Sequence, residues 1–489
     1  MRDAASRRGQ EISLLALCAL LLAWQVLLPG FIGLANNNDF AKVAGPLSLE
    51  GADHGADNFV FFQSDYLRAP KYYFNPGIPS SEIAAAWLAS SIERTLSAPA
   101  LFDIRWLGAI HALLFLGFYY AVLVLLRPLA TLPRIALSLA ALWIFADAGL
   151  LSYFNSFYTD TTAILGALTA AVLGVLLARS SQIDLGLLAL FGLAALVFIT
   201  SKSQHGIWGF IPAVFVIALV WRNPILRVRI TGAAIAAILL CGSIWIVAET
   251  HDWDKAMARF DLIFFSLTPN SPNPSEDLHE LGLNDADLRY VGMHSFMPGT
   301  PINDTSWRTG FYSRCTYGDV AKFFLHHPGR ALGKLKSDLW NEAWQRRPVN
   351  LSNYQRTDGH PAGAKTTRFA SFGALRTKLF QWWPPYVIVW FVALLILCPI
   401  LARREQSRFS RSVAWTTLVL SLVASGEFCF ASLTDACETY RHLLLFHVFT
   451  DLTVFFALVF AASLLPTAGQ SEMTLRFRKT MADQPFINQ

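Results

Sequence analysis

Residues 106–126 read WLGAIHALLFLGFYYAVLVLL, a stretch in which no Asp, Glu, Lys or Arg occurs. A helix of about 20 apolar residues crosses the hydrocarbon core of a bilayer, which is about 30 Å thick. The stretch therefore predicts a transmembrane helix. The chain as a whole agrees, because 54% of its 489 residues are hydrophobic and only 15% are charged, too few to cover the surface of a soluble protein.

Similar apolar stretches recur along the chain and predict about ten transmembrane helices in total. They cover residues 12–34, 106–126, 135–151, 161–178, 185–200, 207–221, 230–248, 387–402, 413–432 and 443–465. We expect an all-α polytopic membrane protein whose two long extracytoplasmic loops carry interfacial helices.

The short loops between these stretches satisfy the positive-inside rule when the N-terminus is placed in the cytoplasm. Their basic residues are Arg127, Arg134, Arg179, Arg222, Arg227, Arg229, Arg403, Arg404, Arg408 and Arg411, joined by Arg476, Arg478 and Lys479 after the last span. Residues 12–34 follow Arg2, Arg7 and Arg8 and are longer than a signal-peptide core, so we interpret them as a retained first span. Both termini are therefore predicted to be cytoplasmic.

This orientation predicts four regions. Residues 1–248 form an N-terminal transmembrane region of about seven helices, which includes the first outer loop at 35–105. Residues 249–385 form an extracytoplasmic loop region, residues 386–466 the C-terminal transmembrane helices, and residues 467–489 a cytoplasmic tail.

Each outer loop is predicted to contain a helix at the membrane surface. In the first loop, Ser80 or Ser81 could cap a helix whose apolar side includes Trp87. In the second loop, residues 319–344 carry apolar side chains at helical spacing, although Pro328 must break the helix. Both segments are interpreted as partly interfacial helices over the bundle.

Charge and cysteine content exclude several other classes of protein. The formal net charge of +5 is spread among loops rather than gathered in a patch, which disfavours nucleic acid and favours lipid phosphate as a partner. The six cysteines form no Cys-x-x-Cys pair, so neither a zinc site nor a disulfide framework is indicated. Cys315 and Cys437 are the pair that could meet and form a disulfide outside the membrane.

A carboxylate follows the first span directly. Asp39 comes after Asn36, Asn37 and Asn38, at the outer edge of the membrane, where an acid is neither needed for solubility nor cheap to bury halfway. We interpret Asp39 as the best candidate for a general base, supported by Asn38. The structural alternative is that Asp39 and the asparagines cap the helix end or the next helix.

Two further outer turns contain clustered polar groups. The turn at 152–160 includes Tyr158 and Asp160, which could support a site but are also typical of an aromatic belt and a helix cap. The turn at 201–205 presents Lys202, Gln204 and His205, donors suited to an anionic lipid head group. Lys202 could instead only extend its amine to the interface.

The last outer turn contains Asp435, Glu438, Arg441 and His442, in which Glu438 and Arg441 are also correctly spaced for an ion pair with each other. Deeper in the same span, His447 and Asp451 are four residues apart and therefore lie on one side of the helix. Because no other mid-membrane acid continues a proton path from His447 and Asp451, we favour a structural pair between them over a proton relay.

These features together resemble the GT-C superfamily of membrane glycosyltransferases. The residues that carry the resemblance are the outward Asp39, the long first loop with its helix, and the final turn with Glu438, Tyr440, Arg441 and His442. More narrowly, the short stretches 38–42, 153–160, 201–205, 260–282 and 438–446 are similar to the bacterial glycan-biosynthesis hexose transferases of that superfamily. The likeness extends from the first span to the last.

The resemblance implies a hexosyltransferase in the bacterial cytoplasmic membrane, active in cell-envelope glycan biosynthesis. Its donor would be a polyprenyl-phosphate sugar, and its acceptor a hydroxyl group on a glycan, lipid or protein. Asp39 would be the general base, whereas the family commonly has two neighbouring acids where this chain has Asn38 and Asp39.

General chemistry supports this mechanism. A positioned carboxylate can deprotonate the attacking hydroxyl, and Lys202, Gln204, His205, Arg441 and His442 can stabilise the phosphate. Because the phosphate leaves already ionised, no acid catalyst is needed, and direct displacement inverts the anomeric centre. No cofactor is expected, although Asp39 with Asp160 could hold a divalent ion. The alternatives are a flippase or transporter of lipid-linked glycans, which Asp451 and His447 suggest, and a glycan ligase or polymerase with a diphosphate-linked donor.

Overall fold

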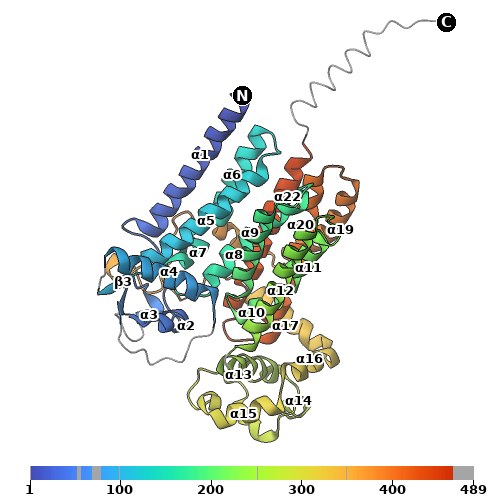
Figure 1. The fold of residues 1–489 in the computed structure, drawn as a ribbon. Helices are drawn as coiled ribbons and strands as arrows, with labels where there is room; N and C mark the ends of the chain where they lie inside the picture. Colours follow the sequence, from blue (N-terminus) through green and yellow to red (C-terminus); the bar gives the residue numbers. More distant parts are fainter. Residues whose placement is uncertain are drawn as a thin grey trace, which may run out of the picture.

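The computed structural model describes residues 2–51, 57–68, 79–97, 100–250, 252–348 and 350–465. Long helices form a bundle, and a smaller helical body lies at the end opposite the N-terminus (Figure 1). The bundle helices are α1 (Arg2–Leu22, continued by η1 at Ala23–Leu27), α5 (Arg105–Leu126), α6 (Thr131–Phe145), α8 (Asp160–Arg179), α9 (Leu185–Ile199), α11 (Phe210–Val220), α12 (Leu226–Ala248), α19 (Tyr386–Arg404), α20 (Arg408–Thr434) and α22 (Leu444–Ser463).

The helical membrane class is confirmed, since every apolar stretch that the sequence analysis identified contains a helix. The predicted first span at 12–34 is too long, because its helix ends at Leu27 and the chain is not helical from Leu28 to Leu34. Among the described residues, eight helices are long and apolar enough to cross a membrane, or up to nine if a bent pair counts as one span. Helix α9 is shorter, with 15 residues. The number of about ten spans stays a prediction.

The stretch at 135–151, predicted as one span, is divided between α6 and α7 (Ala148–Leu151). The chain bends by 47° at this break. Asp147 causes it, because its carboxylate accepts hydrogen bonds from the Gly149 N–H at 2.8 Å and from the Gly373 N–H at 2.9 Å. A helix cap inside an apolar stretch starts a new helix in a new direction.

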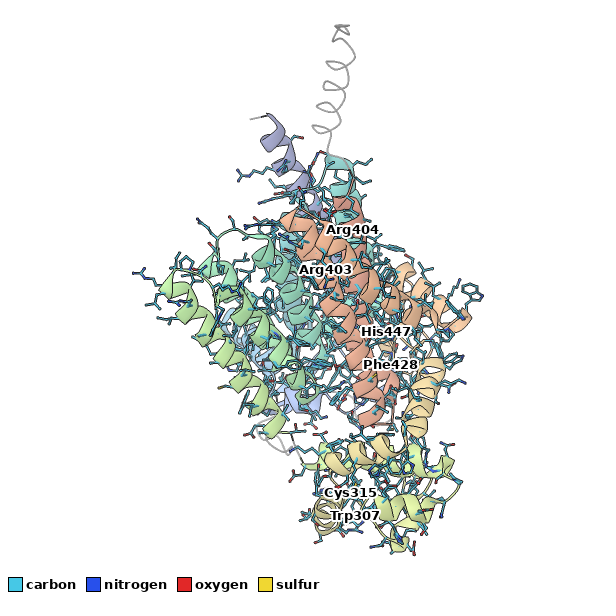
Figure 2. The ribbon with its side chains drawn as sticks, turned by 90° about the vertical axis from the view of Figure 1, so that its right-hand side faces the viewer. Trp307, Cys315, Arg403, Arg404, Phe428 and His447 are labelled. Carbon is cyan, nitrogen blue, oxygen red and sulfur yellow. The ribbon has the colours of Figure 1, made fainter. Side chains whose placement is uncertain are left out.

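Helices α8 and α22 are at the centre of the bundle, since 78% of the apolar window of each is buried, against 28% for α12 and α19. Helix α22 packs on α20, and α8 packs on α5 and α9. The smaller helical body, residues 252–326, is called the outer body below. The ends of α8 and α22 that point toward it hold the candidate site. Arg403 and Arg404 lie at the opposite end of the bundle from Trp307 and Cys315 of that body (Figure 2).

The position of Arg403 and Arg404 at the end of the bundle away from the outer body agrees with the positive-inside argument, but the assignment of either end to the cytoplasm stays a prediction. The predicted tail at 467–489, with Arg476, Arg478 and Lys479, lies outside the described residues.

The first loop contains the expected helix and a small sheet that was not expected. Helix α4 spans Ser81–Leu96, and the Ser80 side chain accepts from the Glu82 N–H at 3.2 Å, which confirms Ser80 as the cap. Strands β1 (Leu49–Gly51), β2 (Asp65–Arg68) and β3 (Leu101–Asp103) form an antiparallel sheet in that order. Helices α2 (Ala41–Ala44) and α3 (Asp57–Val60) and the 3₁₀ turn η2 (Gly45–Leu47) complete this loop.

The second loop begins with the outer body, which has its own hydrophobic core around Phe260, Phe264, Leu278, Phe311 and Phe323. Its helices are α13 (Asp252–Phe260), α14 (Pro274–Glu280), α15 (Thr305–Arg314) and α16 (Tyr317–His326), with the shorter turns η5 (Asp261–Leu267), η6 (Thr268–Asn270), η7 (Asp285–Tyr290) and η8 (Pro301–Asn303). A separate core explains why this part stands apart from the bundle.

The predicted break at Pro328 is confirmed, because α16 ends at His326 and Pro328 begins α17 (Pro328–Asn341). The prediction that both halves lie over the bundle holds for the second half. Helix α17 packs on the bundle helix α20, whereas α16 buries Val320 and Phe323 in the core of the outer body. Apolar spacing predicts that a face is buried, not which body covers it.

The chain then returns into the bundle through α18 (Ser371–Trp382), preceded by the short turn η9 (Arg356–Asp358). Arg346 lies 2.6 Å from one carboxylate oxygen of Asp451 on α22, and Arg376 on α18 lies 3.4 Å from the other. The predicted pair of His447 and Asp451 is therefore wrong. His447, inside the bundle in Figure 2, packs between Phe380 and Phe446 instead. Local spacing could not reveal arginines that arrive from a distant loop.

All six cysteines are free, so Cys315 and Cys437 form no disulfide. Cys315 is instead buried within the outer body, and its carbonyl oxygen accepts a hydrogen bond from the buried Arg259.

Candidate functional site

Asparagines shape the turn that presents Asp39. The Asn36 side chain accepts from the Asn38 N–H at 2.8 Å and from the Phe40 N–H at 3.3 Å, and the Asn37 side chain accepts from the Asp39 N–H at 3.3 Å. Asn38 has a φ of +78°, a left-handed conformation that asparagine tolerates better than most residues. The asparagines therefore fix the backbone of this turn. They do not cap a helix, because the N-cap of α2 is Phe40 and no side chain caps it, and the Asp39 carboxylate is used elsewhere.

The Asp39 carboxylate lies between two cations. Lys42 is 3.0 Å from one oxygen, and Arg441 pairs with the other across a separation of 402 residues in sequence. Arg441 also contacts Glu438 at 2.5 Å, and its guanidinium lies over the Tyr158 ring, 5.8 Å from the centroid. The first and last outer segments thus meet at one ion-pair cluster, and Glu438 and Arg441 do pair, as the simpler alternative proposed.

Tyr158 holds the first segment in place. Its hydroxyl donates to the Ala35 carbonyl oxygen at 2.9 Å and accepts from the Asn37 N–H at 3.1 Å. The ring is buried and packs against Phe40 and Tyr153. Tyr158 therefore supports the turn that carries Asp39.

The charges around Asp39 set its ionisation. Burial alone would raise the pKa of this carboxyl group, but the charges of Lys42, Arg441 and Lys202 outweigh burial and hold its pKa well below the usual range. Burial likewise opposes the charged form of Arg441, whereas Asp39 outweighs it and raises the pKa of the guanidinium. Asp39 is therefore ionised at neutral pH, and its negative charge is shared among several cations.

Asp160, at the start of α8, and Lys202, just before α10, lie beside this cluster. Their carboxylate and amine are 3.7 Å apart. This distance is longer than a good charge-assisted hydrogen bond. His205, in the short helix α10 (Ser203–Gly206), is buried, stacks on Phe198 and meets the Ser201 hydroxyl at 2.8 Å. His205 thus lies one layer behind Lys202.

A buried acid that the sequence analysis missed organises Gln204 and His442. Glu427 on α20 is fully buried and accepts from Gln204 at 2.8 Å and from Trp208 at 2.5 Å. Gln204 in turn lies 3.4 Å from Nδ1 of His442, and Nε2 of His442 is 3.2 Å from Asp435. The detectable signal was an acid within the apolar stretch 413–432, because ionisable groups in a span are rarely incidental.

Lys42 and Asp254 were also missed as site residues. Lys42 is 3.1 Å from Asp254 on α13, so it connects Asp39 to the outer body. Burial disfavours its charged form, yet Asp39 and Asp254 outweigh this and raise the pKa of the amine. Lys42 lies three residues after Asp39, a spacing that indicates a local ion pair, whereas the partner Asp254 could not be inferred from spacing.

The structure thus brings Asp39, Tyr158, Asp160, Lys202, Glu438 and Arg441 together and places Gln204, His205 and His442 in a second layer. Within the described residues, no group of three or more His, Cys, Asp or Glu side chains could hold a metal ion. Such an arrangement can bind an anion through its cations and use a carboxylate as a proton acceptor.

Comparison with solved structures finds the archaeal oligosaccharyltransferase AglB from Archaeoglobus fulgidus in complex with an inhibitory peptide and a dolichol-phosphate. Its TM-score is 0.38 at 12% identity, over 98% of this chain and 52% of the AglB chain. The chain thus spans about half the length of that protein. Comparison with curated proteins finds no match. The family model described as the YfdI N-terminal transmembrane domain matches residues 2–474, and the chain therefore belongs to this family of multi-pass membrane domains.

Proposed function

We propose that the protein is a membrane glycosyltransferase that moves a hexose from a polyprenyl-phosphate donor to a hydroxyl acceptor on the extracytoplasmic side, with inversion. The observation that carries the proposal is the cluster in which Asp39 meets Arg441 and Lys42 at the outer ends of the central helices. The resemblance to GT-C enzymes and the membrane location of the family agree with it.

The donor phosphate would bind between Lys202 and Arg441. Lys202 is the more weakly engaged of the two, because its amine is 3.7 Å from Asp160, whereas Arg441 contacts two carboxylates. Preorganised cations in a site that excludes water stabilise the charge that the phosphate carries as it leaves. No acid catalyst and no cofactor is required by this chemistry.

Asp39 would act as the base that removes the proton of the acceptor hydroxyl, a contribution of roughly 10² to 10⁴-fold. A carboxylate with a strongly lowered pKa is a weak base. We infer that the donor phosphate competes for Arg441 and Lys202, which weakens their hold on Asp39 and raises its pKa. Base strength would then develop only after the donor has bound, which limits reactions without it.

The partners of this reaction are the lipid-linked donor, membrane lipids, and an acceptor that is a glycan, a lipid or a protein. The proposed location is a bacterial cytoplasmic membrane, with both termini in the cytoplasm. A transporter was suggested by Asp451 and His447, but Asp451 is held by Arg346 and Arg376, an arrangement that suits a fixed charge better than a moving proton.

The direct test is hexose transfer in proteoliposomes by the Asp39→Asn variant. This substitution keeps the size of the side chain and removes the base, so we expect turnover to fall by at least about 10²-fold. Asp285→Asn, which removes an acid of the outer body whose side chain is 65% exposed, is the matched control and should leave turnover unchanged. Equal turnover of Asp39→Asn and the wild type would disprove the role of Asp39.

The donor class is tested in the same vesicles with purified monophosphate-linked and diphosphate-linked sugars side by side. Transfer from the monophosphate-linked donor alone is expected. Transfer only from the diphosphate-linked donor would instead identify a ligase or polymerase.

A further inference from the structure

Four aromatic rings form a row on the outer body. The ring of Phe265 lies 5.5 Å from that of His294, His294 lies 6.2 Å from Phe296, and Phe296 lies 6.3 Å from Trp253, measured between centroids. Phe296 is 60% exposed and Phe265 is 40% exposed. Such exposure of neighbouring rings is costly in water and points to a surface that binds something.

Hydrogen bonds hold this ring row in place. Ser295, between His294 and Phe296, donates from its N–H at 2.6 Å and from its hydroxyl at 2.8 Å to the buried carboxylate of Asp261. The Phe296 N–H lies 3.2 Å from Nδ1 of His294. The row is therefore a fixed feature of the body and not the product of one loose loop.

One end of the ring row leads to the candidate site. Trp253 precedes Asp254, which binds Lys42, which in turn binds Asp39. At the middle of the row, Ser295 binds Asp261, whose pKa is raised to about 7 by burial and by the charge of Asp435. Asp435 belongs to the last outer turn, which also provides Arg441. A ligand on the row would thus extend from the charged cluster over the outer body.

We propose that the ring row binds the sugar units of a carbohydrate chain, which makes the acceptor a glycan; the inference rests on the proposed function. Pyranose rings present faces of polarised C–H groups that pack on aromatic rings, while their hydroxyl groups require polar neighbours. The row offers both, because Trp253 donates to Asn303 at 3.2 Å and His294 and Ser295 lie among the rings.

The test uses the full chain in nanodiscs on an array of defined bacterial surface oligosaccharides, and measures binding without turnover. The wild type should bind a subset of these glycans. Loss of two rings in the Phe265→Ala and Phe296→Ala double variant should weaken binding at least about tenfold, whereas Phe296→Tyr keeps a ring and should stay within about threefold.

The matched control is the Leu325→Ala and Leu332→Ala double variant, which removes two other side chains that are 80% and 66% exposed. It should bind like the wild type. Glycan binding is measured without donor and without turnover, whereas the role of Asp39 is tested by hexose transfer, so failure of the proposed base and failure of the glycan surface give different results.

Two outcomes would overturn the proposal. The first is that the wild-type chain binds no glycan, and the second is that the double ring variant binds as the wild type does. In the second case, poor insertion of the ring variant into liposomes would assign the row to the membrane surface.

Discussion

Removing the charge of Asp451 should destabilise the protein more than any other single loss of an acid. Asp451 lies on the central helix α22 and is fully buried, and Arg346 and Arg376 that face it are buried as well. The Asp451→Asn variant keeps the volume but leaves two guanidinium groups without their counter-charge. These arginines belong to the segment that returns from the outer body, so the cluster connects that segment to the bundle.

The magnitude follows from the geometry. Two unit charges 4 Å apart attract each other by about 4 kcal/mol at an effective dielectric constant of 20, and the Arg346 contact of 2.6 Å is closer than that. Removal of one partner of a buried pair costs about 3–5 kcal/mol, because the other charge stays buried. We expect Asp451→Asn to lower the free energy of unfolding by this amount. The double variant Asp451→Asn with Arg346→Gln should recover part of the loss.

The measurement is an SDS titration of the purified protein in mixed micelles, followed by circular dichroism. Glu249→Gln, at an exposed acid, is the control and should change the free energy of unfolding by less than about 0.5 kcal/mol. The reasoning is refuted if Asp451→Asn unfolds at the same SDS fraction as the wild type. It is also refuted if the double variant is less stable than the single variant.

Three further outcomes are expected. The folded-state pKa of Asp261, about 7, lies above the ordinary 3.8, so its contribution to stability is complete below about pH 4 and is lost as the pH rises through 7; Asp261→Asn should flatten the fall of the melting temperature between about pH 4 and 7, and an unchanged slope would contradict this. Arg441→Lys loses the planar fork that contacts Asp39 and Glu438, so the KM for the donor should rise about tenfold or more in vesicle kinetics, and an unchanged KM would count against it. Glu427→Gln leaves one of two partly buried donors without its acceptor and should lower the free energy of unfolding by about 1–3 kcal/mol in the SDS titration; an unchanged midpoint would show that the acid is dispensable.

Features with a local physical cause could be predicted from the sequence. The helices followed from apolar length, the start of α4 from the cap at Ser80, and the end of α16 from Pro328. An acid shortly after the first span, Asp39, was also evident, although the helix ends earlier than predicted, at Leu27. Each of these depends on residues a few positions apart, which is the range over which helix geometry and capping act.

Features that depend on distant segments could not be predicted. The break between α6 and α7 is reinforced from afar, because the Gly373 N–H donates to Asp147 from 226 positions away. Arg346 replaced His447 as the partner of Asp451 for the same reason. The sheet of the first loop is equally hidden, since its strands of three or four residues are too short to show an alternating pattern.

The candidate site follows the same division. The residue types at the outer turns indicated an acid and several cations, and the structure brings Asp39 and Arg441 into contact. Two contacts were not evident because their partners lie far apart in sequence. Lys42 contacts Asp254 and so joins the two outer loops, and Gln204 contacts Glu427 and so joins an outer turn to helix α20. Spacing identifies candidates, but only the fold decides which of them are neighbours.

The most direct measurement is a cryo-EM structure of the protein in nanodiscs with a polyprenyl-phosphate hexose bound. The account predicts that a phosphate oxygen lies about 3 Å from the nitrogens of Lys202 and Arg441, with Asp39 released from Arg441 and facing the position of the acceptor hydroxyl, on the side of the anomeric carbon opposite the phosphate. A donor phosphate bound elsewhere, for example at Arg346 and Arg376, with Asp39 still paired to Arg441, would contradict it.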